Sequence, residues 1–251
     1  ISLPTLKALA DLDYIKLEKK QILRDSYHQI ITKQNTDKKL TSDQMTALKN
    51  IEIAQHQGKQ KFLLYGVTGS GKTQIYIEMA LKARALGKQA LILVPEIVLT
   101  GQLVTSFKEY FTDDVAVIHS RLSVGERNDT FWRIRTKQIG IIIGARSALF
   151  APFEDLGLIV MDEEHDPSYK QDESPRYHSH DIIEKMAEIY HATLIMGSAT
   201  PSLESYYKAQ IGEYVLLKMP NRIDNLPLPY IEGVDMREEL RMGNRKIISL
   251  K

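Results

Sequence analysis

The sequence predicts an α/β fold in which helices cover both faces of a mostly parallel sheet. From residue 61 onward, short apolar runs alternate with longer stretches of helical periodicity. Two of the runs, 139–143 and 157–161, are almost wholly apolar, as expected of strands that are buried on both faces. A glycine-rich octapeptide at residues 66–73 joins the first apolar run, 61–65, to the first helical stretch after it. These observations together predict one layered domain with a phosphate-binding loop.

The elements of this domain follow from the alternation of the two periodicities. Strands are predicted at residues 61–65, 89–94, 115–118, 139–143, 157–161, 192–196 and 213–217. Helices are predicted between them at 72–86, 97–110, 123–137, 179–190 and 201–209. A further helix is expected to begin at the polar cluster starting with Thr41 and to continue to Ile53.

The two ends of the chain follow a different pattern from the middle. Leucines recur at helical intervals in residues 3–12, residues 14–24 alternate in part like a small hairpin, and residues 31–40 form a polar linker. Residues 221–251, with Leu-Pro-Leu-Pro at 226–229, are expected to form an extended connector. The expected units are therefore 1–30, the linker at 31–40, the layered domain at 41–220 and the connector at 221–251.

The composition is that of an ordinary globular domain. Of the 251 residues, 43% are hydrophobic and 26% are charged, and no apolar run is long enough to predict a membrane span. The sequence contains no cysteine, which excludes disulfides and cysteine-ligated zinc and fits a cytoplasmic location. A net charge of +1 does not by itself indicate nucleic-acid binding. The chain begins Ile-Ser-Leu-Pro, so we expect it to be the middle of a longer protein.

The octapeptide has the pattern G-x-x-x-x-G-K-[ST] between a strand and a helix. Glycines let the backbone curl, so that its N–H groups and the start of the following helix point at phosphate oxygens. Lys72 is expected to reach the β- and γ-phosphates, and Thr73 to ligate Mg²⁺. The alternative is a glycine-rich turn without a ligand. The predicted nucleotide-binding residues of the loop are Gly66, Val67, Thr68, Gly69, Ser70, Gly71, Lys72 and Thr73.

Two further motifs follow predicted strands. The apolar run 158–161 leads into Asp162-Glu163-Glu164-His165, the position at which an NTPase places its Mg²⁺-binding aspartate. Asp162 is expected to hold the ion, and Glu163 to act as the general base on the attacking water. After the strand at 192–196, Ser198 and Thr200 lie in a tight turn from which their hydroxyls can contact the acidic motif. A plain turn before a helix with an early proline is the alternative.

With these motifs in this order, the sequence resembles the superfamily 2 helicases, and among them the replication-restart helicases. The resemblance is carried by residues 63–73, 94–97, 119–120, 144–153, 162–171, 175–178 and 197–205, and it spans about residues 40–240. It implies the RecA-like ATP-binding lobe of a 3′→5′ DNA helicase that acts in replication restart and primosome assembly. Residues 1–30 would then be the end of a winged-helix domain.

The resemblance also assigns roles to single residues. Gln44 would read adenine, for which a glutamine amide is suited, and His165, Ser198 and Thr200 would couple ATP to DNA. His180 stands where the family pattern suggests arginine. The alternatives are a polar residue in a helix turn for Gln44, a salt bridge for Arg146 and a solvated loop for residues 166–180. The implied DNA-binding residues are Pro95, Arg146, Ser147, Tyr169, Lys170, Arg176, Tyr177 and His178.

The implied cofactors are ATP and Mg²⁺, and the implied partners are forked or single-stranded DNA, other primosome proteins and single-strand-binding proteins, with no membrane. The resemblance places a zinc-binding cysteine cluster and a second motor lobe outside this chain, so we expect the chain alone to be nearly inactive as an ATPase. Other readings of the motifs are a different superfamily 2 translocase, a small-molecule kinase with a phosphate-binding loop, and a module that only binds nucleotide.

Overall fold

A seven-stranded parallel sheet forms the centre of the molecule in the computed structural model, which describes residues 3–16, 39–99, 101–223 and 232–245. The strand order is β3-β4-β2-β5-β8-β1-β9. All seven predicted strands are confirmed, with ends that differ from the prediction by at most two residues. The strands are β1 (Lys61–Gly66), β2 (Gln89–Leu93), β3 (Val115–Ile118), β4 (Ile141–Gly144), β5 (Leu156–Asp162), β8 (Thr193–Ser198) and β9 (Val215–Met219).

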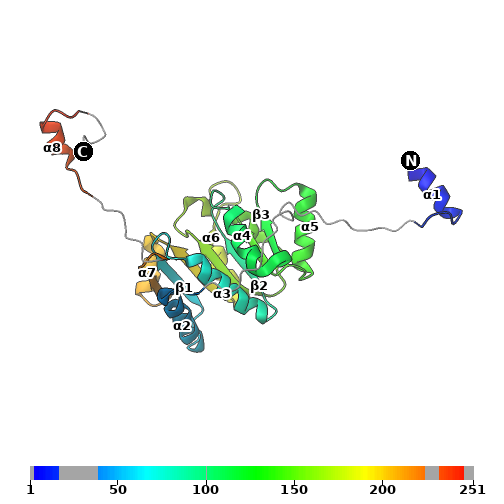
Figure 1. Ribbon diagram of the computed structural model, residues 1–251, viewed down its shortest axis with the longest axis horizontal. Coiled ribbons are helices and arrows are strands. Elements are labelled where there is room, and N and C mark those ends of the chain that lie inside the picture. The colour runs from blue at the N-terminus through cyan, green and yellow to red at the C-terminus, as the bar shows by residue number, and fades with distance from the viewer. Residues whose placement is uncertain (1–2, 17–38, 100, 224–231, 246–251) are drawn as a thin grey trace.

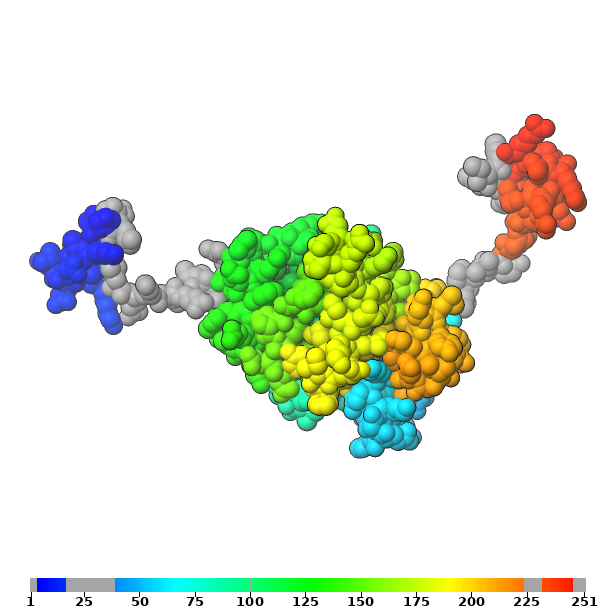
Figure 2. All heavy atoms as spheres, turned by 180° about the vertical axis from the view of Figure 1, so that it is seen from behind, coloured from blue at the N-terminus to red at the C-terminus, as the bar shows by residue number. Residues whose placement is uncertain are grey.

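Helices cover both faces of this sheet, as the apolar strands predicted (Figure 1). One face packs against α2 (Ser42–His56), α3 (Lys72–Ala85) and α4 (Gly101–Phe111). The other packs against α5 (Val124–Arg135), α6 (Ser179–Tyr190) and α7 (Leu203–Gln210), and α6 and α7 lie side by side in Figure 2. The two cores share the strands, because successive side chains point to opposite faces: Leu64 of β1 belongs to the first core and Leu63 to the second.

Local chemistry explains where two of the helices begin. Thr41 caps α2 in a capping box with Gln44, as its side-chain oxygen accepts from the Gln44 amide at 3.3 Å. This confirms the predicted start, although the helix continues to His56, beyond the predicted end at Ile53. The predicted start of α4 at residue 97 is wrong, since the helix begins at Gly101. The amides of Val98 and Leu99 instead donate to the Pro95 carbonyl in a turn, at 2.8 and 3.1 Å.

Several short elements fill the connections at the carboxyl end of the sheet. The connection from β5 to α6 is an antiparallel hairpin of β6 (Lys170–Gln171) and β7 (Tyr177–His178) rather than an irregular loop. This β6–β7 hairpin follows the short 3₁₀ helix η3 (Pro167–Tyr169). Two other 3₁₀ helices are η1 (Thr112–Asp114), before β3, and η2 (Arg146–Phe150), after β4.

The segments at the two ends lie outside the layered domain (Figure 1). The helix predicted at residues 3–12 is present as α1 (Leu3–Asp11). Most of the predicted hairpin at 14–24 and of the linker at 31–40 lies outside the described residues. The expected connector at 221–251 is not extended throughout, because it contains α8 (Met236–Arg241). None of the helices in the described part of the chain is both long and apolar enough to cross a membrane.

Candidate nucleotide-binding site

The loop between β1 and α3 has the tight curl that its glycines predicted. Gly69 and Gly71 have φ angles of +80° and +82°, in the left-handed region that favours glycine. Gly66 leaves room for a neighbour in the loop, since a Cβ there would lie 2.7 Å from the Ser70 hydroxyl oxygen. That hydroxyl is buried and has no hydrogen-bond partner among the described residues. The loop therefore presents an unsatisfied hydroxyl at the start of a helix, where anions bind.

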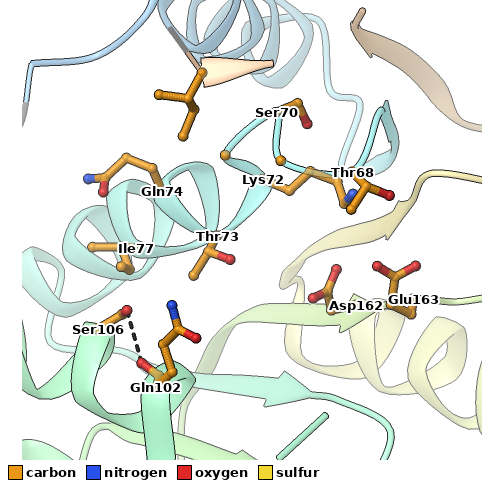
Figure 3. A pocket seen from close by; sticks show the side chains of 13 residues that line it. Thr68, Ser70, Lys72, Thr73, Gln74, Ile77, Gln102, Ser106, Asp162 and Glu163 are labelled. Atoms are coloured by element: carbon orange, nitrogen blue, oxygen red, sulfur yellow. Dashed lines mark hydrogen bonds between the residues drawn. The ribbon is translucent and has the colours of Figure 1, made fainter. Parts of the chain in front are cut away.

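A cavity of about 600 Å³ lies beside this loop, within the size range of small-molecule sites. Lys72 and Thr73 line one side of it, and Asp162 and Glu163, at the end of β5, line another (Figure 3). The ammonium of Lys72 is folded back over the loop, where it donates to the Gly66 carbonyl at 3.0 Å. The two motifs that the sequence separates by about ninety residues thus meet at one cavity.

The residues present fit a magnesium nucleotide. Loop amides and the Lys72 ammonium suit phosphate oxygens, and the Thr73 hydroxyl and the Asp162 carboxylate are oxygen ligands of the kind that Mg²⁺ prefers. Among the described residues, no group of three or more His, Cys, Asp or Glu side chains could hold a metal ion. A metal at this cavity would therefore be held by few protein ligands together with the phosphates, which is the usual arrangement for Mg²⁺.

Asp162 is held by a tyrosine that the sequence did not single out. Tyr76 of α3 is fully buried, and its hydroxyl donates to Oδ1 of Asp162 at 2.7 Å. Gly197 on the neighbouring strand β8 makes the contact possible, since a Cβ at this position would collide with the Tyr76 hydroxyl. Burial raises the pKa of Asp162, while the hydrogen bond from Tyr76 opposes that rise. The one signal in the sequence was that Tyr76 lies one helical turn after Lys72.

Glu163 turns the chain sharply at the end of β5. Its φ angle is +45°, in a region that non-glycine residues rarely adopt and that stores about 1–3 kcal/mol. The turn is closed by hydrogen bonds from the Asp166 amide to the Glu163 carbonyl at 2.9 Å and from the Glu164 amide to the Gly197 carbonyl at 3.0 Å. As a result, Asp162 and Glu163 both face the cavity (Figure 3).

Glu164, the next acid, points away from the cavity into a buried network. It accepts hydrogen bonds from the Ser202 amide at 2.7 Å and the Ser205 hydroxyl at 2.8 Å, and it lies 2.9 Å from Nε2 of His180. Burial raises its pKa, yet the hydrogen bonds from His180, Ser202 and Ser205 together hold that pKa below its ordinary value. His180 therefore ties α6 to the acidic motif, and Glu164 joins this motif to the start of α7.

The predicted contact between the acidic motif and the turn after β8 is present. His165 Nδ1 lies 2.8 Å from the Ser198 hydroxyl, and its Nε2 lies 3.4 Å from the hydroxyl of Thr200. The Thr200 amide also donates to the Ser198 hydroxyl at 2.9 Å. The contact itself is confirmed, whereas the coupling of ATP to DNA by these three residues stays a prediction.

Arg146, which follows β4, is hydrogen-bonded to the chain at the start of the β6–β7 hairpin. Its Nη1 donates to the carbonyls of Ser168, at 3.0 Å, and Lys170. The guanidinium also lies 5.8 Å from the centre of the Tyr177 ring, which packs edge-on against Phe150 at 5.5 Å. Nη1 of Arg146 is therefore used within the chain, and the side chain is half-buried at the surface.

Two of the predicted DNA-binding residues are not at the surface. Tyr169 is 1% exposed, and its hydroxyl donates to the Asp162 carbonyl at 2.7 Å. The prediction that Tyr169 contacts DNA is therefore wrong for this conformation, because the ring completes the core under β5. Pro95 is also buried, two residues after the end of β2. The remaining predicted DNA contacts stay predictions: Lys170 and Arg176 are exposed, and Ser147, Tyr177 and His178 are half-buried.

Gln44 is built into the support of the phosphate loop. Its Oε1 accepts from the Thr41 amide at 2.8 Å, and its Nε2 donates to the Gly71 carbonyl at 3.1 Å. The side chain is buried, and the cavity is lined by other residues. Both ends of the amide are thus occupied within the chain, and the reading of adenine by Gln44 stays a prediction.

Comparison with known proteins identifies the class. The family model of the DEAD/DEAH box helicases matches residues 41–209, so this chain belongs to that family. The small-molecule kinase alternative is therefore excluded.

Individual relatives are more specific. The chain is 46% identical over 248 residues to the Replication restart protein PriA of Bacillus subtilis (strain 168). The aligned residues make up 98% of this chain and 31% of that protein. This chain is 40% identical over 253 residues to the protein of the same name from Synechocystis sp. (strain ATCC 27184 / PCC 6803 / Kazusa), covering 99% of this chain and 30% of that protein. The chain is thus a homologue of PriA and spans about a third of the length of these relatives.

Solved structures support the fold. RecG bound to a three-way DNA junction matches with a TM-score of 0.54 at 23% identity, over 78% of this chain and 25% of that one. The Sulfolobus solfataricus SWI2/SNF2 ATPase core in complex with dsDNA matches with a TM-score of 0.53 at 17% identity, over 79% of this chain and 49% of that one. The layered domain is therefore a RecA-like lobe with a seven-stranded parallel sheet.

Proposed function

We propose that this chain is the ATP-binding motor lobe of an ATP-dependent 3′→5′ DNA helicase that acts in replication restart and primosome assembly. The observation that supports it best is the cavity at which the phosphate loop meets Asp162 and Glu163. Contacts from the same acidic motif reach β8, α6 and α7. The proposed process is supported by the name of the relatives, Replication restart protein PriA.

Each side of the cavity has a distinct task in this proposal. Amides of the loop and the Lys72 ammonium hold the phosphates. Gln44, behind Gly71, would read the adenine by exchanging its present bonds to Thr41 and Gly71 for the base. Thr73 and Asp162 hold Mg²⁺, which when bound neutralises charge on the β- and γ-phosphates. Glu163 accepts the proton of the attacking water, for which its turn at the end of β5 directs it into the cavity.

Rapid turnover needs more positive charge than the cavity has. Among the described residues that line it, Lys72 is the one cation. Phosphoryl transfer commonly uses an added arginine, worth about 10³–10⁵ in rate, and by resemblance that arginine belongs to a second motor lobe. The chain alone should therefore bind ATP and hydrolyse it very slowly.

DNA is proposed to bind along the carboxyl ends of the strands. Lys170, Arg176, Tyr177 and His178 of the β6–β7 hairpin would contact forked or single-stranded DNA, together with Arg146 and Ser147. The hairpin begins directly after Tyr169, whose hydroxyl bonds to the Asp162 carbonyl. If DNA moves the hairpin, the position of Asp162 at the ATP site would consequently change. The contacts of His165 with Ser198 and Thr200 would transmit the movement to the end of β8.

The remaining assignments complete the proposal. Residues 1–30 would be the end of a winged-helix domain, 31–40 a linker, 41–220 the lobe and 221–251 a connector. Other primosome proteins and single-strand-binding proteins are the proposed partners, and the cytoplasm is the proposed location. The zinc-binding cysteines that the resemblance implies are proposed to lie outside this chain, whose sequence contains no cysteine.

Calorimetric titration of the chain with ADP and with Mg²⁺–ATP tests the proposal. Lys72→Ala should abolish measurable binding, because Lys72 supplies the compact positive charge nearest the phosphates. Lys49→Ala, on the exposed face of α2, removes the same charge away from the cavity and should bind like the unaltered chain. Glu163→Gln should keep the affinity and remove any slow hydrolysis. Equal affinity for Lys72→Ala and the unaltered chain would overturn the proposal.

A further inference from the structure

The segment that follows the last strand crosses the phosphate loop. We call residues 219–223, from the last residue of β9 onward, the post-β9 segment. At its start, the Met219 carbonyl accepts from the Val67 amide at 3.1 Å, and at its end, the Ile223 amide donates to the Gly69 carbonyl at 3.0 Å. The segment is thus hydrogen-bonded to the loop at both of its ends, by backbone groups alone.

The same segment is attached to the start of α2. The amide and the side-chain Nδ2 of Asn221 both donate to Oδ2 of Asp43, at 3.2 and 3.1 Å. Asp43 precedes Gln44, whose side chain bonds to the Gly71 carbonyl. The post-β9 segment, the beginning of α2 and the phosphate loop therefore form one connected unit around the loop glycines.

Ile223 extends from this unit to the nucleotide cavity. It lines the cavity and is 41% exposed. A Cβ at Gly71 would lie 3.0 Å from its Cδ1 and 2.5 Å from Nε2 of Gln44, so the two side chains close around the same glycine. Of the other residues that line the cavity, Ile77 is the one with a large apolar side chain.

The two ends of the cavity differ in chemistry. Thr73, Asp162 and Glu163 provide oxygen ligands and mark the end for the metal and the terminal phosphate. The wall formed by Gly71 and Ile223 has no charged side chain and offers an exposed branched alkyl group. Nucleotide sites pair a polar phosphate end with apolar surface for the sugar and base, so this wall suits the nucleoside.

We propose that Ile223 makes an apolar contact with the ribose or base of the bound nucleotide, and that the post-β9 segment completes the nucleotide site. The inference rests on the proposed nucleotide binding and adds a binding residue to it. The match to the helicase family model ends at residue 209, so this contact lies outside the part of the lobe that the family model describes. The Ile223–Gly69 hydrogen bond links the position of this side chain to the loop that holds the phosphates.

Two probes separate the nucleoside contact from the phosphate contact. ADP carries both parts, whereas inorganic tripolyphosphate carries only phosphates. Ile223→Ala should weaken ADP binding about five- to tenfold, because it removes apolar groups that the nucleoside would cover, and should leave tripolyphosphate binding unchanged. Ile223→Leu should restore most of the ADP affinity. Ile211→Ala, at the exposed end of α7, is the matched control and should change neither affinity.

The outcomes distinguish this inference from the function on which it rests. If Lys72→Ala loses both probes while Ile223→Ala binds ADP like the unaltered chain, nucleotide binding stands and the Ile223 contact is overturned. Equal losses of ADP and tripolyphosphate in Ile223→Ala would also overturn it, since the residue would then act by shaping the loop. If Lys72→Ala binds both probes normally, the proposed function itself falls. Thermal denaturation of each variant verifies that it is folded.

Discussion

The two sides of the nucleotide cavity are built in different ways. The phosphate loop is shaped mainly by its own backbone, through the left-handed glycines Gly69 and Gly71 and the Lys72 contact with the Gly66 carbonyl. The acidic motif is instead shaped by side chains from α3, α6 and the start of α7 and by the end of β8. The distant elements that touch the loop, Gln44 and the post-β9 segment, bond to its main-chain groups. The acidic side is held instead through its own side chains, so movement of the distant elements can shift its carboxylates directly.

Two carboxylates of the acidic motif extend the comparison. Asp162 is buried with a single side-chain donor, Tyr76, and burial raises its pKa. Glu164 is also buried, but its three side-chain partners hold its pKa below the ordinary value. Two carboxylates thus differ in role because of what surrounds them. Asp162 lines the cavity, whereas both carboxylate oxygens of Glu164 accept hydrogen bonds inside the protein.

The largest expected effect comes from breaking the acidic side at Glu164. Glu164→Ala leaves His180, Ser202 and Ser205 without their acceptor in a buried site, and losing one partner of a buried charged network costs about 3–5 kcal/mol. The free energy of unfolding from urea denaturation measures this loss. Glu163→Ala is the matched control, and its cost should stay within about 0.5 kcal/mol, since Glu163 faces the cavity. Similar losses for both variants would contradict the network as the support of the motif.

On the loop side of the cavity, one added methyl group should disrupt nucleotide binding. Gly71→Ala puts a Cβ at a φ angle of +82°, 2.5 Å from Gln44 Nε2 and 3.0 Å from Ile223 Cδ1. We expect a loss of about 1–2 kcal/mol in stability from the left-handed conformation and a fall in nucleotide affinity of more than tenfold from the collision. Gly87→Ala, at φ +72° with nothing within 4 Å, carries the strain without the collision. Its nucleotide affinity in the same titration should be normal. A parallel fall would mean that a general loss of stability, and not the collision at Gly71, lowers the affinity.

A milder change tests whether the acidic side positions its carboxylate. Tyr76→Phe keeps the buried ring but removes the hydrogen bond to Asp162, at a cost of about 0.5–1.5 kcal/mol in stability. Asp162 then loses its side-chain donor, and the Mg²⁺ concentration at half-saturation of ATP binding should rise about threefold, a shift equivalent to about 0.6 kcal/mol. Tyr190→Phe removes a comparable hydroxyl contact, to the Phe153 carbonyl, far from the cavity. If both variants show the same Mg²⁺ dependence as the unaltered chain, Tyr76 only supports the core.

The same contrast explains what the sequence could predict. The strands, the helix cap at Thr41 and the curl of the loop at its glycines depend largely on neighbours in the sequence, and these predictions were confirmed. Tyr169 was expected to bind DNA because the resemblance implied it, but its ring is 1% exposed under β5. Tyr76 was missed because its partner, Asp162, is distant in the sequence. Ile223 was missed because it lies beyond β9, outside the regular alternation of strands and helices.

A second glutamate on the α6–α7 face gives the smallest expected effect and the sharpest contrast with Glu164. Glu184 of α6 accepts from Lys208 of α7 and from Tyr214 just before β9, and none of the three lines the cavity. Burial raises its pKa, but the hydrogen bonds from Lys208 and Tyr214 hold it below the ordinary value. Its ionised form is therefore favoured by folding, and this part of the stability is present above the unfolded-state pKa of about 4.3 and is lost as the pH falls through the lower folded-state pKa.

Glu184→Gln should consequently lower the melting temperature most near pH 7, and the difference from the unaltered chain should shrink as the pH falls below about 4. Thermal denaturation of both proteins between about pH 3 and pH 7 measures this difference. A difference that does not change with pH would show that packing of the side chain, not its charge, provides the stability. Nucleotide affinity should be unaffected, because Glu184 bonds to α7 and Tyr214 but to no residue that lines the cavity. A drop in affinity would mean that the dependence of the acidic side on distant elements extends across the whole α6–α7 face and not only through Glu164.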